Sequence, residues 1–400
     1  MLYCANRKIQ AQRSCDRKED MKKFRLYVMH LAVLIFVLAI LFSAAELLLR
    51  YSIVRKAPPN STHTVEAGYL PVVTRANWHG TIWGVPVTTN RYGFRDEPDF
   101  SMTPLPDEIR IMALGDSIGL GVGIPASSHY TKVAERALKK NEDGQNYHVI
   151  NAGGQGYSPS CYHVYLKHQG LRFNPALVVT EMELCNDITD EALLFWETES
   201  GSDSLNAIRG GRYIMGWDGN MLATCARGPY FFERTYVYTD LLRRFLYLRY
   251  RLNPTEPFHS QPQKGTSYYS LGFDRYLLDE QRIETGWTKT FGALQQTSEL
   301  LKMRNTRFLL MILPSRYMFN DSAPEWQSFA SNLVRRACDM AEKKRIPYVN
   351  MTEAIRQGGG TRLFMDFAHL NEEGNRVVGQ ALSGLIQQAL SENGADSRVP

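Results

Sequence analysis

The chain has few cysteines and no cysteine motif. Six cysteines occur among 400 residues, and no two are spaced as Cys-x-x-Cys, which excludes the usual zinc and dithiol redox signatures. The nine histidines show no metal-ligand spacing either, so we expect no metal and no cofactor. Plain buried thiols are the simplest expectation. One disulfide stays an open alternative, with unknown pairing, among Cys161, Cys185, Cys225 and Cys338.

The body of the chain also lacks net charge. Residues 1–25 hold eight Lys or Arg and three acids, and the other 375 residues hold 38 of each sign. The net charge of +5 therefore comes from the N-terminal segment alone. A balanced body has no general electrostatic attraction for phosphate backbones, which argues against nucleic-acid binding.

An apolar run follows the basic segment at residues 26–49. About 24 apolar residues suffice to cross the hydrocarbon core of a membrane as a helix. Because cations crowd its N-terminal side, the positive-inside rule places the N-terminus in the cytoplasm and the body in the periplasm or outside the cell. A cleaved signal peptide is the alternative, since Ser43-Ala44-Ala45 resembles a cleavage site. The run resumes as Leu47-Leu48-Leu49, and we expect an uncleaved anchor, with Met21 as an alternative start.

Composition predicts the organisation of the chain. A main domain at 109–392 carries an insertion at about 190–285 and ends in a disordered tail. The segments around it are, in order, a basic cytoplasmic tail at 1–25, a transmembrane helix at 26–49, a tether with an N-terminal extension at 50–108, and the tail at 393–400.

Predicted strands and helices alternate within the main domain. Short apolar runs that indicate buried strands occur at 110–114, 148–151, 176–182, 307–313 and 348–351. Helical patterns occur at 129–140, 160–170, 286–303, 324–344 and 372–391. Such alternation is typical of a parallel sheet with helices on both faces. We therefore expect an α/β fold, a three-layer α/β/α sandwich of flavodoxin-like type.

The insertion at 190–285 interrupts the alternation and is rich in aromatic residues. It also contains a basic helical stretch at Thr239–Leu252. Its aromatics could stack on sugar rings, but packing a small core of its own is the simpler role. The aromatic residues of the insertion include Phe195, Trp196, Trp217, Phe231, Phe232 and Tyr236.

Ser117 follows the first predicted strand by a short turn, in Gly115-Asp116-Ser117. Ligands of parallel α/β sheets lie beyond the carboxyl ends of the strands, which is where a nucleophile is expected. The segment also fits the Gly-x-Ser-x-Gly elbow of α/β-hydrolases. That fold places several strands before its serine, whereas only one precedes Ser117 in the alternating region, so we discard that interpretation. A structural Gly-Asp-Ser turn is the simpler alternative for the tripeptide taken alone.

Asp366 and His369 lie just before the last predicted helix, three residues apart. At this spacing a carboxylate can bind one imidazole nitrogen, set the tautomer and leave the other nitrogen for a serine. Asn186 and Gly156 each follow a predicted strand, and they could donate an amide or a backbone N–H to an oxyanion. Taken alone, each group has a simpler alternative. An Asp-x-x-His pair is common by chance, Asn186-Asp187 could be a turn or a helix cap, and Gly156 could be an ordinary loop glycine.

The order of these four groups resembles the SGNH hydrolases, the GDSL-type esterase and lipase family. The matching blocks are Gly115-Asp116-Ser117, the glycine block ending in Gly156, Asn186-Asp187, and Asp366-x-x-His369. The resemblance implies a catalytic triad of Ser117, His369 and Asp366. It also implies an oxyanion hole made by the N–H groups of Ser117 and Gly156 and the amide of Asn186. Where the family often has Gly-x before Asn-Asp, this chain has Leu184-Cys185.

A serine-dependent ester hydrolase anchored in the membrane is the function that these features favour. The segment Thr89–Arg95 and the anchor also resemble membrane-tethered bacterial envelope members of the family, some of which modify acyl groups on polysaccharides. An ester or an acylated glycan is therefore the expected substrate. The alternatives are a glycan O-acetyltransferase that uses the same triad, and a catalytically silent glycan-binding protein. Acyl-chain length, oligomeric state and protein partners are not predicted.

Overall fold

The computed structural model divides into two compact units, Met1–Pro59 with Pro229–Arg244, and Asn60–Gly228 with Phe245–Pro400. The residues that it describes are 21, 23–48, 63–65, 67–96, 99–140, 145–192, 194–209, 211–215, 221–226, 237, 241, 280–322 and 324–391.

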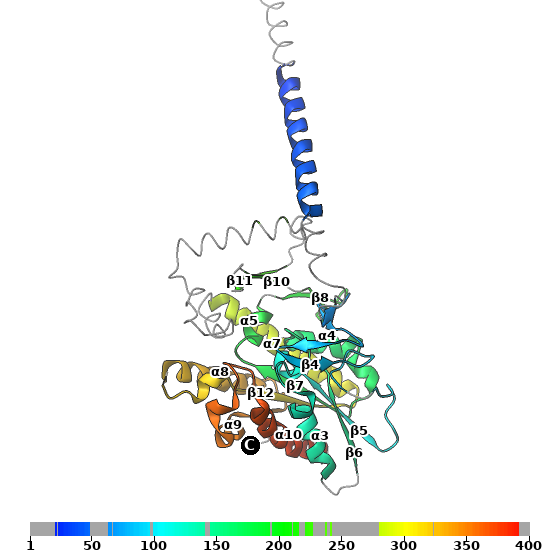
Figure 1. The fold of residues 1–400 in the computed structure, drawn as a ribbon, viewed down its shortest axis with the longest axis vertical. Helices are drawn as coiled ribbons and strands as arrows, with labels where there is room; N and C mark the ends of the chain where they lie inside the picture. The colour runs from blue at the N-terminus through cyan, green and yellow to red at the C-terminus, as the bar shows by residue number, and fades with distance from the viewer. Residues whose placement is uncertain are drawn as a thin grey trace, which may run out of the picture. The chain divides into compact units, whose positions relative to one another are not determined.

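The first unit contains the predicted apolar helix. It runs from Lys23 to Leu48 over 26 residues, with a mean hydropathy of 2.7 in its most apolar window (Figure 1). This length and composition suit a membrane span and equally a signal sequence. Near the end of the helix, the Glu46 carboxylate accepts a hydrogen bond of 3.0 Å from the backbone N–H of Val237.

The second unit is built on a parallel five-stranded sheet with the strand order β13-β12-β7-β5-β6. Every neighbouring pair in this sheet is parallel, which confirms the expected α/β fold. The strands are β5 (Glu108–Leu114), β6 (Asn146–Asn151), β7 (Leu177–Glu183), β12 (Arg307–Leu313) and β13 (Tyr348–Asn350).

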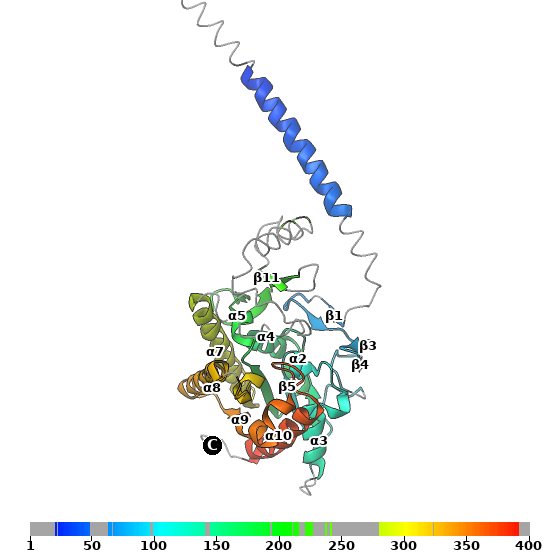
Figure 2. The ribbon, with the colours of Figure 1, turned by 60° about the vertical axis from the view of Figure 1, so that its left-hand side comes forward.

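Helices cover both faces of the sheet (Figures 1 and 2). On one face, α3 and α10 pack against each other. On the other, α4 packs on α7, and α8 contacts α7 through the Arg336 guanidinium, 4.5 Å from the centre of the Trp287 ring. The bounds are α3 (Tyr130–Lys140), α4 (Pro159–His168), α7 (Glu280–Met303), α8 (Pro324–Lys343), α9 (Thr352–Gly358) and α10 (Glu372–Ser391). Each of these helices except α9 was predicted from the sequence, with bounds that differ by at most six residues.

The two central strands explain why the sheet forms where it does. All seven residues of β7 are buried, and all of β12 except its first residue. Strands covered on both faces are apolar throughout rather than alternating, which is the pattern that predicted them. However, β7 buries Glu181 and Glu183 as well. These two acids end up beside the site described below.

Short elements surround this core. Residues 63–96 form two antiparallel pairs, β1 with β2 and β3 with β4, and the described start of the predicted insertion forms two more, β8 with β9 and β10 with β11. The strands are β1 (Thr64–Val65), β2 (Val73–Thr74), β3 (His79–Ile82), β4 (Val85–Thr88), β8 (Phe195–Thr198), β9 (Leu205–Arg209), β10 (Gly211–Met215) and β11 (Met221–Ala226). The short helices are α2 (Ser117–Leu120), η1 (Ala126–Ser128), η2 (Gly170–Phe173), α5 (Asp187–Glu191), η7 (Arg316–Phe319) and η8 (Gly360–Leu363).

Some expectations fall wholly or mostly on residues that the structure does not describe. Trp217, Phe231, Phe232 and Tyr236 lie outside the described residues, and so does nearly all of the predicted helix at 239–252. Trp196 is described, and it packs against the main core. Cys161, Cys185 and Cys338 are free thiols, as in the simpler expectation.

Candidate active site

Ser117 lies in a tight turn at the carboxyl end of β5. It is the first residue of α2, which is buried along its whole length. The Asp116 side chain caps the helix by accepting a hydrogen bond of 2.8 Å from the N–H of Ile118, and Gly121, at φ +79°, ends it. Capping by Asp and a left-handed glycine are the usual devices for a short helix. The turn is thereby held with its serine at the edge of the sheet.

Glu181 supports this turn from below. Its carboxylate accepts hydrogen bonds from the backbone N–H groups of Asp116, at 3.3 Å, and Gly119, at 3.0 Å. A Cβ at position 115 would lie 2.7 Å from the Glu181 carboxyl, so only glycine allows this approach. The glycine of Gly-Asp-Ser is therefore explained by its close contact with a buried acid.

His369 lies in a loop between η8 and α10. The Asp366 carboxylate closes this loop by accepting hydrogen bonds from the backbone N–H groups of Ala368, at 2.9 Å, and His369, at 2.8 Å. Its second oxygen lies 2.9 Å from His369 Nδ1. One carboxylate thus shapes the loop and orients the imidazole ring.

The two segments meet at the edge of the sheet. Ser117 Oγ lies 2.9 Å from His369 Nε2, although 252 positions separate the residues in sequence. With Nδ1–H donated to Asp366, Nε2 is the nitrogen left to accept the serine hydroxyl proton. Ser117, His369 and Asp366 therefore form one continuous hydrogen-bonded chain, with the serine and the histidine both buried. This is the arrangement in which a serine hydroxyl can be activated as a nucleophile.

The ionisation of the pair suits this role. Burial alone would lower the pKa of His369, but the hydrogen bond and charge of Asp366 more than offset it and raise the pKa above 6.5. Burial would raise the pKa of Asp366. The hydrogen bonds from the His369 ring and from the two backbone N–H groups lower it instead. At neutral pH the carboxylate is charged, and the imidazole can take up a proton.

Asn186 lies on the same edge, after β7, but its amide already has partners. Its nitrogen lies 3.3 Å from a carboxylate oxygen of Asp116 and 3.3 Å from one of Asp190. The same Asp116 oxygen is 3.4 Å from Ser117 Oγ, which places the amide next to the nucleophile. The expected oxyanion donor is thus nearby, but it must exchange a carboxylate contact in order to act.

The glycine block packs directly on the nucleophile turn. The N–H of Gly154 donates a hydrogen bond of 2.9 Å to the carbonyl of Gly115. Gly156 adopts φ +68°, which favours glycine. Within the described part of the chain, the backbone N–H groups of Gly156 and Ser117 have no hydrogen-bond acceptor. Both are therefore free to donate to a ligand.

Trp83 borders the site from the N-terminal extension, which the sequence did not predict. It lies in the turn between β3 and β4, and its ring centre is 4.7 Å from that of His369. Trp83 and Gly84 both have positive φ, as in a type I′ turn, where Asn and Gly are preferred over Trp. The ring is 42% exposed. An aromatic residue held in a strained position beside the candidate base is itself a candidate binding residue.

Arg95, also in the extension, holds the other end of the nucleophile turn. Its guanidinium donates to the carbonyls of Leu120, at 3.0 Å, and Ile124, at 2.5 Å, and also to that of Gly121. Burial lowers the pKa of Arg95 to about 10, so the group remains charged at neutral pH. The motif Thr89–Arg95 therefore braces the nucleophile turn, which its resemblance to envelope proteins did not reveal.

The described residues contain no group of three or more His, Cys, Asp or Glu side chains placed to hold a metal ion. The acids nearest the serine instead contact backbone N–H groups and hydroxyls. Glu183 accepts from the N–H of Cys185 at 2.9 Å, and Asp187 accepts from the N–H of Glu183 at 2.8 Å. Two glutamates within an otherwise apolar strand were the sequence signal for this cluster.

Comparisons with known proteins found no matching family model and no matching curated protein. Several solved structures resemble this chain. One is a two-domain esterase active on acetylated mannans, which is 12% identical to this chain with a TM-score of 0.38. The similarity covers 73% of this chain and 52% of that esterase. The chain thus spans about half the length of that esterase.

Two further structures resemble the chain over most of their own length. A putative acylhydrolase from Bacteroides fragilis has 18% identity and a TM-score of 0.35, with coverage of 72% of this chain and 89% of that one. A catalytic mutant of an acetylxylan esterase from Geobacillus stearothermophilus has 12% identity and a TM-score of 0.37, with coverage of 72% and 97%.

Proposed function

We propose that the chain is a serine ester hydrolase of the SGNH type. The observation that carries the proposal is the hydrogen-bonded chain from Ser117 Oγ through His369 to Asp366. A buried serine, an imidazole with a raised pKa and an ionised carboxylate supply a nucleophile, a general base and the group that orients the base.

The reaction follows from these contacts. His369 Nε2 takes the hydroxyl proton as Ser117 Oγ attacks the ester carbonyl carbon, and the imidazolium forms beside the Asp366 carboxylate. The N–H groups of Ser117 and Gly156 are the proposed donors to the carbonyl oxygen, which becomes an oxyanion. When the intermediate collapses, His369 returns the proton to the departing alcohol. Water then attacks the acyl-enzyme by the same route, which releases the acid and restores the serine.

Asn186 is the third proposed oxyanion donor. Its amide nitrogen is shared between two carboxylates at 3.3 Å, which is long for a hydrogen bond to a charged group. If the amide gives up one of these carboxylate contacts and donates to the developing oxyanion, it exchanges one negatively charged acceptor for another. The donor would therefore act at the moment when charge appears on the substrate oxygen.

An acylated glycan is the substrate class that we favour. Trp83 offers a half-exposed ring next to His369, the residue that would return the proton to the departing alcohol. Sugar rings stack on exposed aromatic faces through their C–H groups. Met365 is 39% exposed, and a Cβ at Gly123 would lie within 3.5 Å of both Met365 and Trp83. The two side chains thus border the same opening.

The decisive experiment compares the full-length protein with Ser117→Ala. We expect the wild type to cleave acetyl or longer-chain nitrophenyl esters and to react with a fluorophosphonate probe at Ser117. Ser117→Ala should lose both properties, whereas Ser331→Ala, which changes a serine of α8, should retain them. An unlabelled wild type that cleaves no ester would refute the proposal and leave the glycan-binding alternative.

Product analysis with an added glycan separates hydrolysis from acyl transfer. For a hydrolase, free acid appears at the same rate with or without the glycan. If the glycan instead becomes acylated in a manner that depends on Ser117, the acyl-enzyme is passed to a sugar hydroxyl and the chain is an acyltransferase.

We also propose that the Lys23–Leu48 helix is an uncleaved anchor, with the body outside the cytoplasm. The support is the basic segment on its N-terminal side together with its length of 26 residues. Mass spectrometry of the protein from membranes tests this proposal. A chain that retains residues 26–49 is expected, whereas a mature N-terminus near Ala45 would identify a signal peptide.

A further inference from the structure

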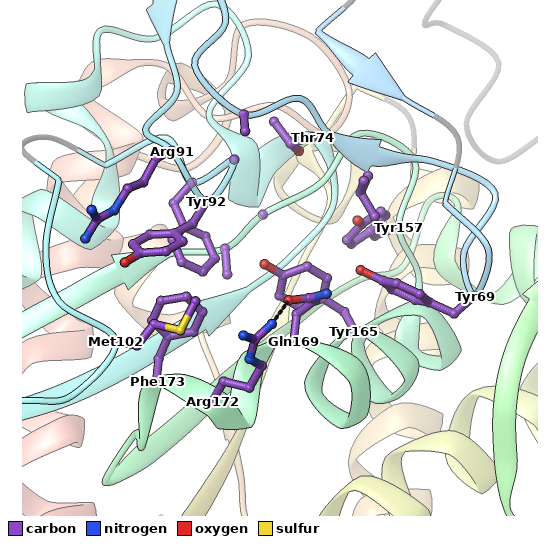
Figure 3. A pocket seen from close by; sticks show the side chains of 16 residues that line it. Tyr69, Thr74, Arg91, Tyr92, Met102, Tyr157, Tyr165, Gln169, Arg172 and Phe173 are labelled. Carbon is purple, nitrogen blue, oxygen red and sulfur yellow. Dashed lines mark hydrogen bonds between the residues drawn. The ribbon is translucent and has the colours of Figure 1, made fainter.

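A second cavity lies between the N-terminal extension and the main domain. Its volume is about 310 Å³, and neither Ser117, Asp366 nor His369 lines it (Figure 3). This volume is at the lower end of small-molecule pockets, which span roughly 300–1,000 Å³. It suits one ring rather than an extended chain. The lining residues are Tyr69, Val73, Thr74, Ala76, Arg91, Tyr92, Gly93, Phe94, Met102, Ala152, Gly153, Tyr157, Tyr165, Gln169, Arg172 and Phe173.

Aromatic rings form much of the cavity wall. Figure 3 shows Tyr69, Tyr157 and Tyr165 gathered on one side and Tyr92 and Phe173 on the other. The rings hold one another in place. Tyr92 meets Phe173 edge-on with centres 5.0 Å apart, and Tyr157 lies 6.2 Å from Tyr165. Such walls bind flat or ring-shaped ligands by their C–H faces.

Two tyrosine hydroxyls in this cavity have no hydrogen-bond partner among the residues that the structure describes. Tyr157 is 3% exposed and Tyr165 is 8% exposed, and burial strongly raises the pKa of both. Within the described part of the chain, neither hydroxyl makes a hydrogen bond. Both nevertheless keep accessible surface, since neither is among the fully buried unpaired atoms. Because unpaired buried hydroxyls are costly, these two are suited to receive the polar groups of a ligand.

The charge of the lining is positive. Among the described residues that line the cavity there are two arginines and no carboxylate. Arg91 is engaged with Asp99, at 3.8 Å, and with the carbonyl of Phe100. Among the described residues, Arg172 donates only to the side-chain oxygen of Gln169, at 3.1 Å, and it retains further N–H groups (Figure 3). The guanidinium of Arg172 is therefore the group available for an anion.

We propose that this cavity binds one residue of a sugar acid, a pyranose ring that carries a carboxylate. The ring faces would stack between Tyr92 and the opposite tyrosines, and the hydroxyls of Tyr157 and Tyr165 would bond the sugar hydroxyls. Arg172 would bind the carboxylate. A cationic ligand is disfavoured by the two arginines, and an acyl chain would leave both phenol groups unpaired.

The cavity adjoins the glycine block of the candidate active site. Gly153 and Tyr157 line it, and a Cβ at Gly153 would lie 2.2 Å from the backbone of Gly119 in the nucleophile turn. An acidic glycan that carries its ester at the triad could therefore have a neighbouring residue in the cavity. Sugar binding itself needs no turnover, so the proposal stands or falls separately from ester hydrolysis.

Titration calorimetry on the full-length protein, in a detergent without a sugar headgroup, tests the proposal. The probes are methyl glucuronoside, which carries the carboxylate, and methyl glucoside, which lacks it. For the wild type we expect a dissociation constant for the glucuronoside on the order of 1 mM. The glucoside should bind about tenfold more weakly, because it lacks the charged partner of Arg172.

Three variants locate the binding. Tyr157→Phe and Tyr165→Phe remove the hydroxyls and keep the rings, and each should weaken glucuronoside binding by about fivefold. Arg172→Gln should weaken it about tenfold and leave the glucoside unaffected. The matched controls, Tyr348→Phe and Arg335→Gln, change a half-buried tyrosine of β13 and an exposed arginine of α8, neither of which lines the cavity, and should bind as the wild type does.

Fluorophosphonate labelling and thermal melting check that each variant is folded. Absence of glucuronoside binding by the wild type would overturn the proposal and leave a cavity that holds only water. Equal binding by the cavity variants and their controls would place the sugar elsewhere. If the two sugars bind equally well, the sugar-acid assignment is wrong.

Discussion

Buried acids lie on both sides of the candidate nucleophile, and the two sides ionise in opposite directions. On the histidine side, the pKa of Asp366 is lowered. On the sheet side, burial and the nearby charge of Asp116 raise the pKa of Glu183 to about 8, and they raise that of Glu181 as well. Ser117 and Asp116 connect the two sides over a few ångströms. The opposite pKa shifts therefore arise from the immediate partners of each acid.

Burial, neighbouring charges and hydrogen-bond donors together account for the contrast. Asp366 receives two backbone N–H bonds and faces an imidazole that can become positive. Glu183 receives one backbone N–H, its second oxygen is buried without a partner among the described residues, and the largest charge effect on it comes from the negative Asp116. Burial always favours the neutral acid, and only sufficient donors or a cation reverse it. One site can thus hold a charged carboxylate for catalysis beside acids that remain protonated.

Asp366→Asn should give the largest effect. The amide keeps the shape of the loop but cannot stabilise the imidazolium, so kcat should fall by about 10³–10⁴-fold. The melting temperature should change little. The measurement is the rate of ester hydrolysis by this variant. Asp339→Asn, which changes a residue on the exposed face of α8, is the control. A loss below tenfold would show that the histidine side works without its carboxylate.

Glu183→Gln should change the pH dependence of stability. Glu183 has a folded-state pKa of about 8 against 4.5 when unfolded, so the folded state binds the proton more tightly. Its contribution to the free energy of unfolding is complete below pH 4.5 and is lost as pH rises to 8. The loss totals on the order of 5 kcal/mol.

Denaturant unfolding at pH 5, 7 and 9 measures this effect. The wild type should lose stability with rising pH relative to Glu183→Gln, which cannot ionise at this position, while the exposed Glu353→Gln should follow the wild type. Parallel curves for the wild type and Glu183→Gln would mean that Glu183 is ionised in the folded protein, and the contrast between the two sides would disappear.

Asn186→Ala tests the group that connects the two sides. Loss of one oxyanion donor costs about 10²–10³-fold in turnover, and the fold should remain intact. The Asn332→Ala control removes an amide on the exposed face of α8. Unchanged turnover would remove Asn186 from the mechanism and leave it as a partner of Asp116 and Asp190 alone.

The rate of Ser117 labelling should follow the ionisation of His369. Because Asp366 raises the pKa of His369, the reactive neutral imidazole is lost as pH falls through this raised pKa. The rate should then drop about tenfold per pH unit. In Asp366→Asn the two largest raising causes are gone while burial remains, so the midpoint should move to lower pH. A midpoint that does not move would show that another group sets it.

Trp83→Ala should have the smallest effect and depend on the substrate. For an acylated oligosaccharide we expect KM to rise several-fold with little change in kcat, because stacking on one ring is worth about 1 kcal/mol. The acetyl ester of a small alcohol serves as the control and should be cleaved at the wild-type rate. Equal losses on both substrates would assign Trp83 to the orientation of His369.

The α/β fold followed from the order of apolar runs. Strands such as Arg307–Leu313 are apolar throughout because they are covered on both faces, and this property is local enough to be seen in the sequence. Likewise, groups that follow parallel strands must share one edge of the sheet, which is why Ser117, Gly156 and Asn186 could be named together. His369 was added through the family resemblance, from its place before the last helix. Their catalytic roles remain predictions.

Only the tertiary structure decided what surrounds these residues. No sequence pattern places Glu181 under Gly115, the Trp83 ring beside His369, or the Arg95 guanidinium on the carbonyls of the nucleophile turn. The sequence by itself determined which segments are apolar, which form strands and which polar groups follow them. Distances, pKa shifts and the unpaired tyrosine hydroxyls depend on which side chains meet across elements. Such contacts arise from packing between distant segments, on which local composition has no bearing.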